Sequence, residues 1–134
     1  MAANTMTTAE YAITQHRLGM SMVEIARLLG VGERAVRRWS DATANSPGPE
    51  ATAKLRTFLA KHEARIDVYL KKARELTTRP VRLKRYSTNE ALREARSPDY
   101  TVRAQDAFLA DLILALRLEK IDVTIESIAA ETES

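Results

Sequence analysis

The sequence contains no cysteine, and it has only four glycines, four prolines and one tryptophan among its 134 residues. The absence of cysteine excludes disulfide bonds, thiolate metal sites and cysteine nucleophiles, and it fits a reducing compartment such as the cytoplasm. Because helix-breaking residues are few and 29% of the residues are charged, helix is favoured over most of the chain. We therefore expect a mainly α-helical, cytoplasmic protein with one domain, or a small domain with an appendage.

The sequence also lacks a long apolar segment. No N-terminal stretch combines a basic region with an apolar run, so no signal peptide is expected. The most apolar window, residues 107–116, is interrupted by Asp111 and is too short to span a bilayer. No Ser/His/Asp set, paired carboxylates, Gly-rich phosphate loop or metal-ligand cluster stands out. These absences predict a protein that is not an enzyme and has no metal, no cofactor and no membrane partner.

The charge is unevenly distributed along the chain. Residues 1–85 carry 16 Lys and Arg against 8 Asp and Glu, whereas residues 86–134 carry 5 against 10. A basic N-terminal part suggests a polyanionic partner, and the acidic C-terminal part suggests a different role.

Two short helical patterns meet at a glycine within residues 22–39. A small residue at Ala26 lets the second helix cross close to the first, and Gly30 can end the first helix in a left-handed conformation. Two helices joined by three or four residues around a glycine are typical of a helix-turn-helix. The residues that we expect to face its core are Ile25, Leu29, Val31, Val36 and Trp39.

The second of these helices carries four charged residues on its outward face. A recognition helix contacts base edges mainly through its N-terminal residues, and arginine is the commonest reader of guanine. Arg34 lies in the first turn and Arg38 lies four residues later, so both are candidate base contacts. Arg37 is better placed for phosphate, and Glu33 could accept from cytosine or favour the positive helix N-terminus.

The start of the first of these helices is a further candidate for DNA contact. Ser21 and Glu24 have the spacing of a capping box, which leaves the next amides pointing outward. Free amides at a helix N-terminus suit a DNA phosphate. Met22 follows in the chain and cannot donate a side-chain hydrogen bond, so its contact would be through the backbone.

The predicted fold is a helix-turn-helix bundle followed by a long connecting helix and a small C-terminal domain with two short strands. The expected divisions are a disordered tail at 1–7, a helix-turn-helix DNA-binding domain at 8–60, a C-terminal dimerisation domain at 61–128 and an acidic tail at 129–134. A first helix at 8–18, capped by Thr8, supplies candidate core residues. These are Tyr11, Ala12, Ile13 and Leu18.

The later elements follow from periodicity and turn signals. Residues 41–50 read as a loop and residues 97–99 as a turn. An apolar stripe at three- and four-residue spacing, which includes His62 and ends at Leu76, predicts one long helix, and Ser87 with Glu90 predicts a second capping box. The expected spans are a long helix at 50–76, a strand at 80–86, a helix at 87–95, a helix at 101–118 and a strand at 121–126.

The helix-turn-helix resembles the Xre/Cro type of bacterial and phage repressors. The long helix followed by RPVRLKRY, a short helix and PDYTVRAQDAFLADLILAL resembles the YdiL-like proteins, which include anti-CRISPR-associated repressors of phages. In that family a strand of the form RP-x-LRFY follows the long helix. Arg79, Pro80, Leu83 and Tyr86 match it, while Arg103 and residues 107–110 match the next helix only loosely.

The resemblance covers residues 8–118. It implies a homodimer that uses its C-terminal part for dimerisation and binds an inverted repeat upstream of its own operon as a transcriptional repressor. It also implies that Arg34 reads a base. The chain departs from the family where aromatic positions are lost in residues 101–118, and the strand at 121–126 is an addition.

Two other functions remain open at this point. An antitoxin-like regulator would engage a basic partner protein through the acidic C-terminal half. An RNA-binding regulator would use the basic and aromatic residues of the strand at 80–86, as RNA-contacting surfaces often do. An ordinary edge strand protected by charge explains the same residues. They are Arg82, Lys84, Arg85 and Tyr86.

Overall fold

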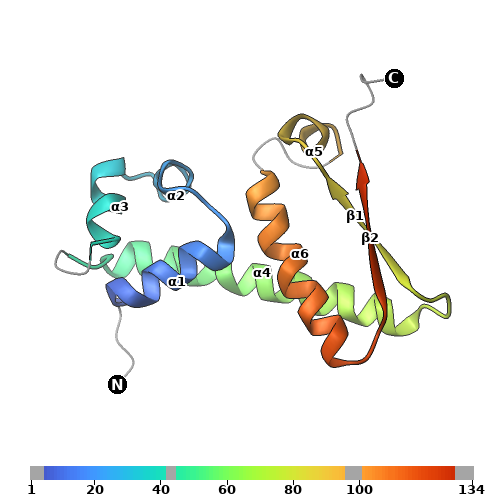
Figure 1. The fold of residues 1–134 in the computed structure, drawn as a ribbon. Helices are drawn as coiled ribbons and strands as arrows, with labels where there is room; N and C mark the ends of the chain where they lie inside the picture. The colour runs from blue at the N-terminus through green and yellow to red at the C-terminus, as the bar shows by residue number, and fades with distance from the viewer. Residues whose placement is uncertain (1–4, 42–44, 96–100, 129–134) are drawn as a thin grey trace. The chain divides into compact units, whose positions relative to one another are not determined.

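The computed structural model describes residues 5–41, 45–95 and 101–128. The chain is mainly helical and has a small parallel sheet (Figure 1). It divides into two compact units, residues 1–63 and 64–134, and each has its own apolar core. In chain order the elements are α1 (Thr8–Leu18), α2 (Met22–Leu29), α3 (Glu33–Trp39), α4 (Pro49–Glu75), β1 (Val81–Tyr86), α5 (Asn89–Ala95), α6 (Val102–Leu118) and β2 (Val123–Ile128).

The predicted bounds of α1 are confirmed, but its N-cap is Thr7 rather than Thr8. The Thr7 hydroxyl oxygen accepts a hydrogen bond from the amide of Glu10 at 3.0 Å. The Glu10 carboxylate accepts one from the amide of Thr7 at 3.1 Å, which completes a capping box. The glutamate three residues after Thr7 therefore selects that residue as the cap.

One face of α1 enters the core of the first unit. Tyr11 and Leu18 are buried as predicted, and Thr14 completes the same face at helical spacing. The predicted burial of Ala12 and Ile13 is wrong, and the Ile13 side chain is 63% exposed. Residues 12 and 13 lie around the helix from Tyr11 and Leu18, so one helix cannot bury all four.

The segment before α1 joins the core at its end. Met6 is buried, and its amide donates to the Thr52 hydroxyl at 3.1 Å. That hydroxyl donates in turn to the carbonyl oxygen of Pro47, at the start of the chain leading into α4. The predicted disordered segment therefore does not extend to Met6 and Thr7, because a buried hydrogen bond holds Met6 and the capping box holds Thr7.

The second unit contains the sheet. β1 and β2 pair in parallel within one chain, with Val81 opposite Val123 and Tyr86 opposite Ile128. The strand predicted at 80–86 is confirmed as β1, whereas β2 begins and ends two residues later than predicted. Ile121 packs in the apolar core instead of extending the strand. The core combines residues of α4, the sheet and α6: Leu70, Ala73, Val81, Phe108, Leu109, Leu112, Leu116 and Ile121.

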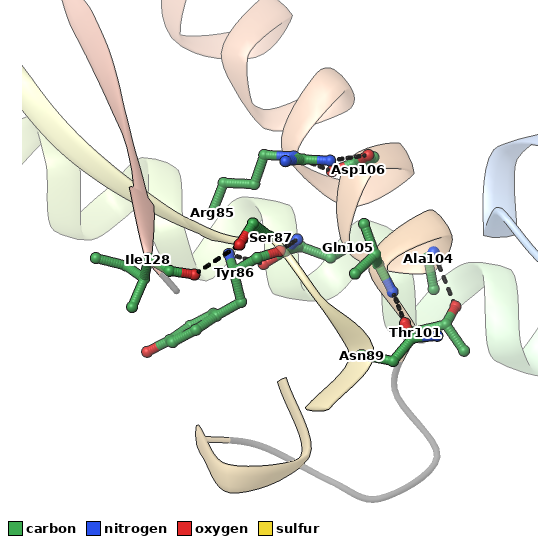
Figure 2. Close-up of polar contacts among 10 residues, drawn as sticks. Arg85, Tyr86, Ser87, Asn89, Thr101, Ala104, Gln105, Asp106 and Ile128 are labelled. Carbon is green, nitrogen blue, oxygen red and sulfur yellow. Dashed lines mark hydrogen bonds and ion pairs between the residues drawn. The ribbon is translucent and has the colours of Figure 1, made fainter. Parts of the chain in front are cut away.

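The cap of α5 lies one residue later than predicted. The amide of Ala91 donates to the Thr88 hydroxyl at 3.1 Å, so Thr88 and not Ser87 caps the helix. Ser87 extends the strand ladder, since its amide donates to the carbonyl oxygen of Ile128 at 3.0 Å. Its hydroxyl donates to the same oxygen (Figure 2). Ser87 therefore continues the hydrogen bonding of the sheet, although the sequence pattern assigned it to the N-cap of α5.

Several expectations for the apolar stripes need adjustment. His62 is buried in α4 as expected, but Leu76 lies beyond the end of that helix and is 50% exposed. In α6, Val102 and Ile113 are half-buried, whereas Phe108 and Leu112 are buried. The turn predicted at 97–99 and the acidic tail at 129–134 lie outside the described residues.

Gln105 binds the backbone at the end of β1. Its side-chain amide donates to the carbonyl oxygen of Tyr86 at 2.9 Å and accepts from the amide of Tyr86 at 2.8 Å (Figure 2). Gln105 is 4% exposed, so both bonds are shielded from water. A glutamine side chain here makes the two bonds that a neighbouring strand would make to one residue.

Replacing Gln105 by Leu should leave both backbone groups of Tyr86 without partners. We expect a loss of about 2–6 kcal/mol in the unfolding free energy, from two buried groups at about 1–3 kcal/mol each. Thermal denaturation followed by circular dichroism, together with hydrogen exchange of the Tyr86 amide, would measure the effect. Gln105→Glu retains the acceptor and should keep the amide of Tyr86 protected. Equal exchange rates in all three proteins would contradict the assignment.

Tyr11 offers a second test, because it is fully buried and its hydroxyl has no hydrogen-bond partner among the described residues. Its ring packs edge to face on Trp39, with ring centroids 5.5 Å apart. Tyr11→Phe should therefore leave stability unchanged or raise it slightly at pH 7, whereas Tyr11→Ala should cost about 3 kcal/mol or more. Urea unfolding followed by Trp39 fluorescence would measure both.

The same tyrosine makes stability depend on pH at the alkaline end. Burial raises the pKa of Tyr11 from 10.0 to about 12. Its stabilising contribution is complete below pH 10, where the unfolded chain also keeps the proton, and is lost as the pH rises toward 12. Tyr11→Phe should flatten this part of the stability profile. An identical decline in both proteins would rule out the contribution of Tyr11.

Candidate nucleic-acid interface

The two faces of α3 differ sharply in polarity. Val36 and Trp39 are buried in the core of the first unit, and Ala35 is half-buried beside them. The remaining four residues of this seven-residue helix are all exposed. They are Glu33, Arg34, Arg37 and Arg38, so the structure brings the four charged candidates together on one helix.

The α3 arginines are not neutralised within the described protein. Across residues 5–41, 45–95 and 101–128, no ion pair or side-chain hydrogen bond involves Arg34, Arg37 or Arg38. By contrast, Arg17 on α1 lies 3.3 Å from a carboxylate oxygen of Glu63. The outward face of α3 thus carries three cations and the one carboxylate of Glu33, a balance that attracts a polyanion.

The turn between α2 and α3 depends on Gly30. Its φ of +70° is the left-handed conformation, and its amide donates to the carbonyl oxygens of Ala26 and Arg27 at the end of α2. The amide of Val31 also donates to the carbonyl oxygen of Ala26, at 3.0 Å. Left-handed glycine is a common helix terminator, so this prediction is confirmed.

The side chain of Val31 does not enter the core, although we predicted that it would. It is 37% exposed, while its backbone completes the end of α2. Ile25 and Leu29 of α2 and Val36 and Trp39 of α3 are buried as predicted. Ala26, whose side chain is small, belongs to the same buried cluster as the inward-facing residues of these two short helices.

Side chains far apart in sequence hold the ends of α2. The Lys54 ammonium group of α4 donates to the carbonyl oxygen of Leu29 at 3.3 Å, which satisfies part of the C-terminal end. Sequence reasoning missed this contact, because the two residues are 25 positions apart and no local motif joins them. The Ser40 hydroxyl, just after α3, lies 3.7 Å from the sulfur of Met22.

Ser21 and Met22 occupy the start of α2 in different ways. The Ser21 hydroxyl oxygen accepts from the amide of Glu24 at 3.2 Å, and the Glu24 carboxylate accepts from the amide of Ser21 at 2.9 Å. The predicted capping box is therefore confirmed. Met22 is half-buried and packs against the apolar core, so its side chain is directed to the protein.

Gly30 and Gly32 form a matched pair for mutation. A Cβ atom would meet nothing within 4 Å at either position, but only Gly30 has a positive φ. Gly30→Ala should therefore cost about 1–2 kcal/mol through backbone strain alone. Gly32→Ala should change stability by less than about 1 kcal/mol, because the restriction of the unfolded chain opposes the preference of the N-cap of α3 for glycine over alanine. Denaturant unfolding would measure both, and equal losses would contradict the assigned backbone.

Neither a metal-binding cluster nor a membrane-spanning helix is present in the described part of the chain. No group of three or more His, Cys, Asp or Glu side chains within it could hold a metal ion. None of its helices combines the length and apolar character that crossing a membrane requires. The charged face of α3 is therefore the candidate site that residues 5–41 present most clearly.

No protein-family model and no curated protein sequence matches this chain. The case for its function accordingly comes from the burial, charge and backbone geometry of α2 and α3.

Proposed function

We propose that this protein is a DNA-binding transcriptional repressor, not an enzyme, in which α2 and α3 act as a helix-turn-helix. The observation that carries the proposal is the outward face of α3. Arg34, Arg37 and Arg38 lie exposed there without protein partners among the described residues. A helix that is fixed by its buried side and carries unpaired guanidinium groups on the other suits the major groove of DNA.

Each charged residue of α3 has a role in this proposal. Arg34 and Arg38 lie four residues apart on one face, where each could make a bidentate contact to O6 and N7 of a guanine. Arg37 lies to the side and contacts a phosphate. Glu33, in the first turn, accepts from a cytosine amine or stabilises the helix N-terminus.

The start of α2 would contact the DNA backbone. The capping box uses the amides of Ser21 and Glu24, but the next amides in the first turn, those of Met22 and Val23, remain available to a phosphate. The half-buried side chain of Met22 supports a backbone contact rather than a side-chain contact there.

The protein would act as a homodimer on an inverted repeat. Two recognition helices about 34 Å apart read half-sites one helical turn apart. Leu114 and Leu118 support dimerisation through the second unit, because they lie four residues apart on α6 and are 59% and 76% exposed. The family resemblance implies that the operator lies upstream of the protein's own phage or bacterial operon.

The observations favour DNA over RNA as the nucleic-acid partner. Of the four residues of β1 that suggested RNA binding, Arg85 does not share a surface with the other three, which line one hollow. Arg85 is held by Asp106, with nitrogen to oxygen distances of 2.8 and 3.0 Å, while Figure 2 shows the ring of Tyr86 directed away from that pair. The α3 arginines have no such protein partner among the described residues.

Alanine substitutions on α3 would separate base contacts from phosphate contacts. Arg34→Ala and Arg38→Ala should each reduce affinity for the operator by about 5- to 150-fold, since a bidentate base contact is worth about 1–3 kcal/mol. Their affinity for scrambled DNA should change far less. Arg37→Ala should weaken binding to both DNAs similarly and reduce the salt slope by about one.

Fluorescence anisotropy would measure these effects with DNA from upstream of the gene, a scrambled duplex and a salt series. Arg117→Ala, an exposed arginine on α6, is the matched control and should bind as the unmodified protein does. If Arg34→Ala and Arg38→Ala both keep full operator affinity, the assignment of α3 as the recognition helix fails. Equal affinity of the unmodified protein for operator and scrambled DNA would refute specific repression.

A further inference from the structure

The second unit has an incompletely satisfied strand edge. Among the described residues its sheet contains only β1 and β2. The amide of Val81 donates to the carbonyl oxygen of Asp122, just before β2, and the amide of Ser87, just after β1, donates to that of Ile128 at the end of β2. The odd-numbered residues of β1 therefore direct their backbone groups to β2. The even-numbered residues then direct theirs to the opposite edge, because the direction alternates along a strand.

Only one end of this opposite edge is satisfied. The side chain of Gln105 pairs with both backbone groups of Tyr86. No such side chain pairs with the backbone of Arg82 or Lys84 within the described ranges. The edge is therefore closed at Tyr86 and open for the two preceding even-numbered positions.

A hollow of about 130 Å³ lies along the same edge. Its apolar lining includes Leu83 of β1 and Leu109 and Leu112 of α6. Aromatic residues form another part of its wall, where the rings of Tyr69 and Phe108 meet edge to face with centroids 5.4 Å apart. An apolar side chain could enter this hollow from a segment lying along β1.

The hollow is electropositive. Its lining includes Arg65, Arg82 and Lys84 and contains no aspartate or glutamate. The Arg65 guanidinium lies over the ring of Phe108, 4.4 Å from its centroid. Arg82 and Lys84 are exposed and make no ion pair among the described residues, although Glu126 is the strand partner of Lys84. The charges favour an acidic occupant.

We propose that the open edge of β1 binds an extended acidic peptide segment of a partner protein, which adds as a third strand. Its backbone would bond to Arg82 and Lys84, its acidic side chains would face those two cations, and its alternate apolar side chains would enter the hollow. Strand addition of this kind takes affinity from backbone hydrogen bonds and specificity from alternate side chains. The site is separate from α3 and does not depend on DNA binding.

The same chemistry disfavours two other occupants. Pairing β1 with β1 of a second copy would place Arg82 and Lys84 near the same cations of the other chain, and like charges directly opposite are destabilising. RNA would use the cations but neither the strand amides in register nor the apolar hollow. An acidic peptide uses all three features.

The first experiment measures binding of a labelled hexapeptide that alternates glutamate and leucine and is capped at both ends. We expect saturable binding to the full-length protein by fluorescence anisotropy. A peptide of the same pattern with lysine for glutamate should bind at least about tenfold more weakly. Two further peptides carry N-methyl groups on alternate amides. Only the set that faces β1 should lose about tenfold in affinity, since it removes the ladder donors.

Protein variants test the charges. The double substitution Arg82→Glu with Lys84→Glu should lower the affinity for the glutamate peptide and raise the affinity for the lysine peptide. An unfolded variant would bind neither peptide, so this reversal distinguishes a changed charge preference from unfolding. Arg103→Glu with Arg117→Glu reverses two exposed charges on α6 and should leave peptide binding unchanged.

The proposal would be overturned by the absence of binding of the glutamate peptide or by equal effects of both N-methyl patterns. Displacement of the peptide by single-stranded RNA, with neither N-methyl pattern having an effect, would overturn it as well. Loss of peptide binding as the protein self-associates would also overturn it, by assigning the edge to a second copy. None of these measurements involves DNA, so failure here leaves the proposed repressor function to its own test.

Discussion

The need to satisfy backbone hydrogen bonds at the ends of short elements shapes both units of this protein. Isolated helices of seven to eleven residues are marginal in water, so α1, α2 and α3 depend on capping and on tertiary packing. Thr7 and Ser21 close the starts of the first two helices, while Lys54 and Gly30 close the end of the second. In the second unit a glutamine side chain satisfies one end of a strand. Side chains thus complete a framework that regular structure alone leaves open.

This constraint also explains why the charged face of α3 can be presented to solvent. The helix has no side-chain cap among the described residues, and its seven residues hold little stability of their own. Val36 and Trp39 supply the stability that so short a helix lacks, because they pack its inner side in a core shared with Tyr11 and Leu55. Because the inner side of α3 is packed in this core, the exposed arginines project from a helix whose orientation within the first unit is defined.

The sequence predicted the features that local patterns encode. The bounds of α1 and α2 agree closely with those that helix periodicity predicted, and alternation of apolar residues located β1. The Ser21 capping box and the left-handed conformation of Gly30 are also present as predicted. The sequence patterns gave wrong predictions where a residue forms hydrogen bonds to groups that are distant in sequence. Ser87 pairs with β2 and so cannot cap α5, and Gln105, which reads as an ordinary helix residue, acts as a strand neighbour. For the candidate site, the sequence pattern correctly placed the four charged residues on one face of α3. No local sequence motif predicts the contact of Lys54 with α2 or, in the second unit, the hollow along β1.

The pair of cations at the open edge of β1 also bears on solubility. An uncovered strand edge is a template for association between copies, and charged residues on it are a common protection. Here that protection is electrostatic and therefore has a range, which shrinks from about 10 Å at 0.1 M salt to about 3 Å at 1 M. Repulsion between the β1 edges of two copies is therefore strong in dilute buffer and weakens as the salt concentration rises. Storage or crystallisation at high salt would favour aggregation through these strands.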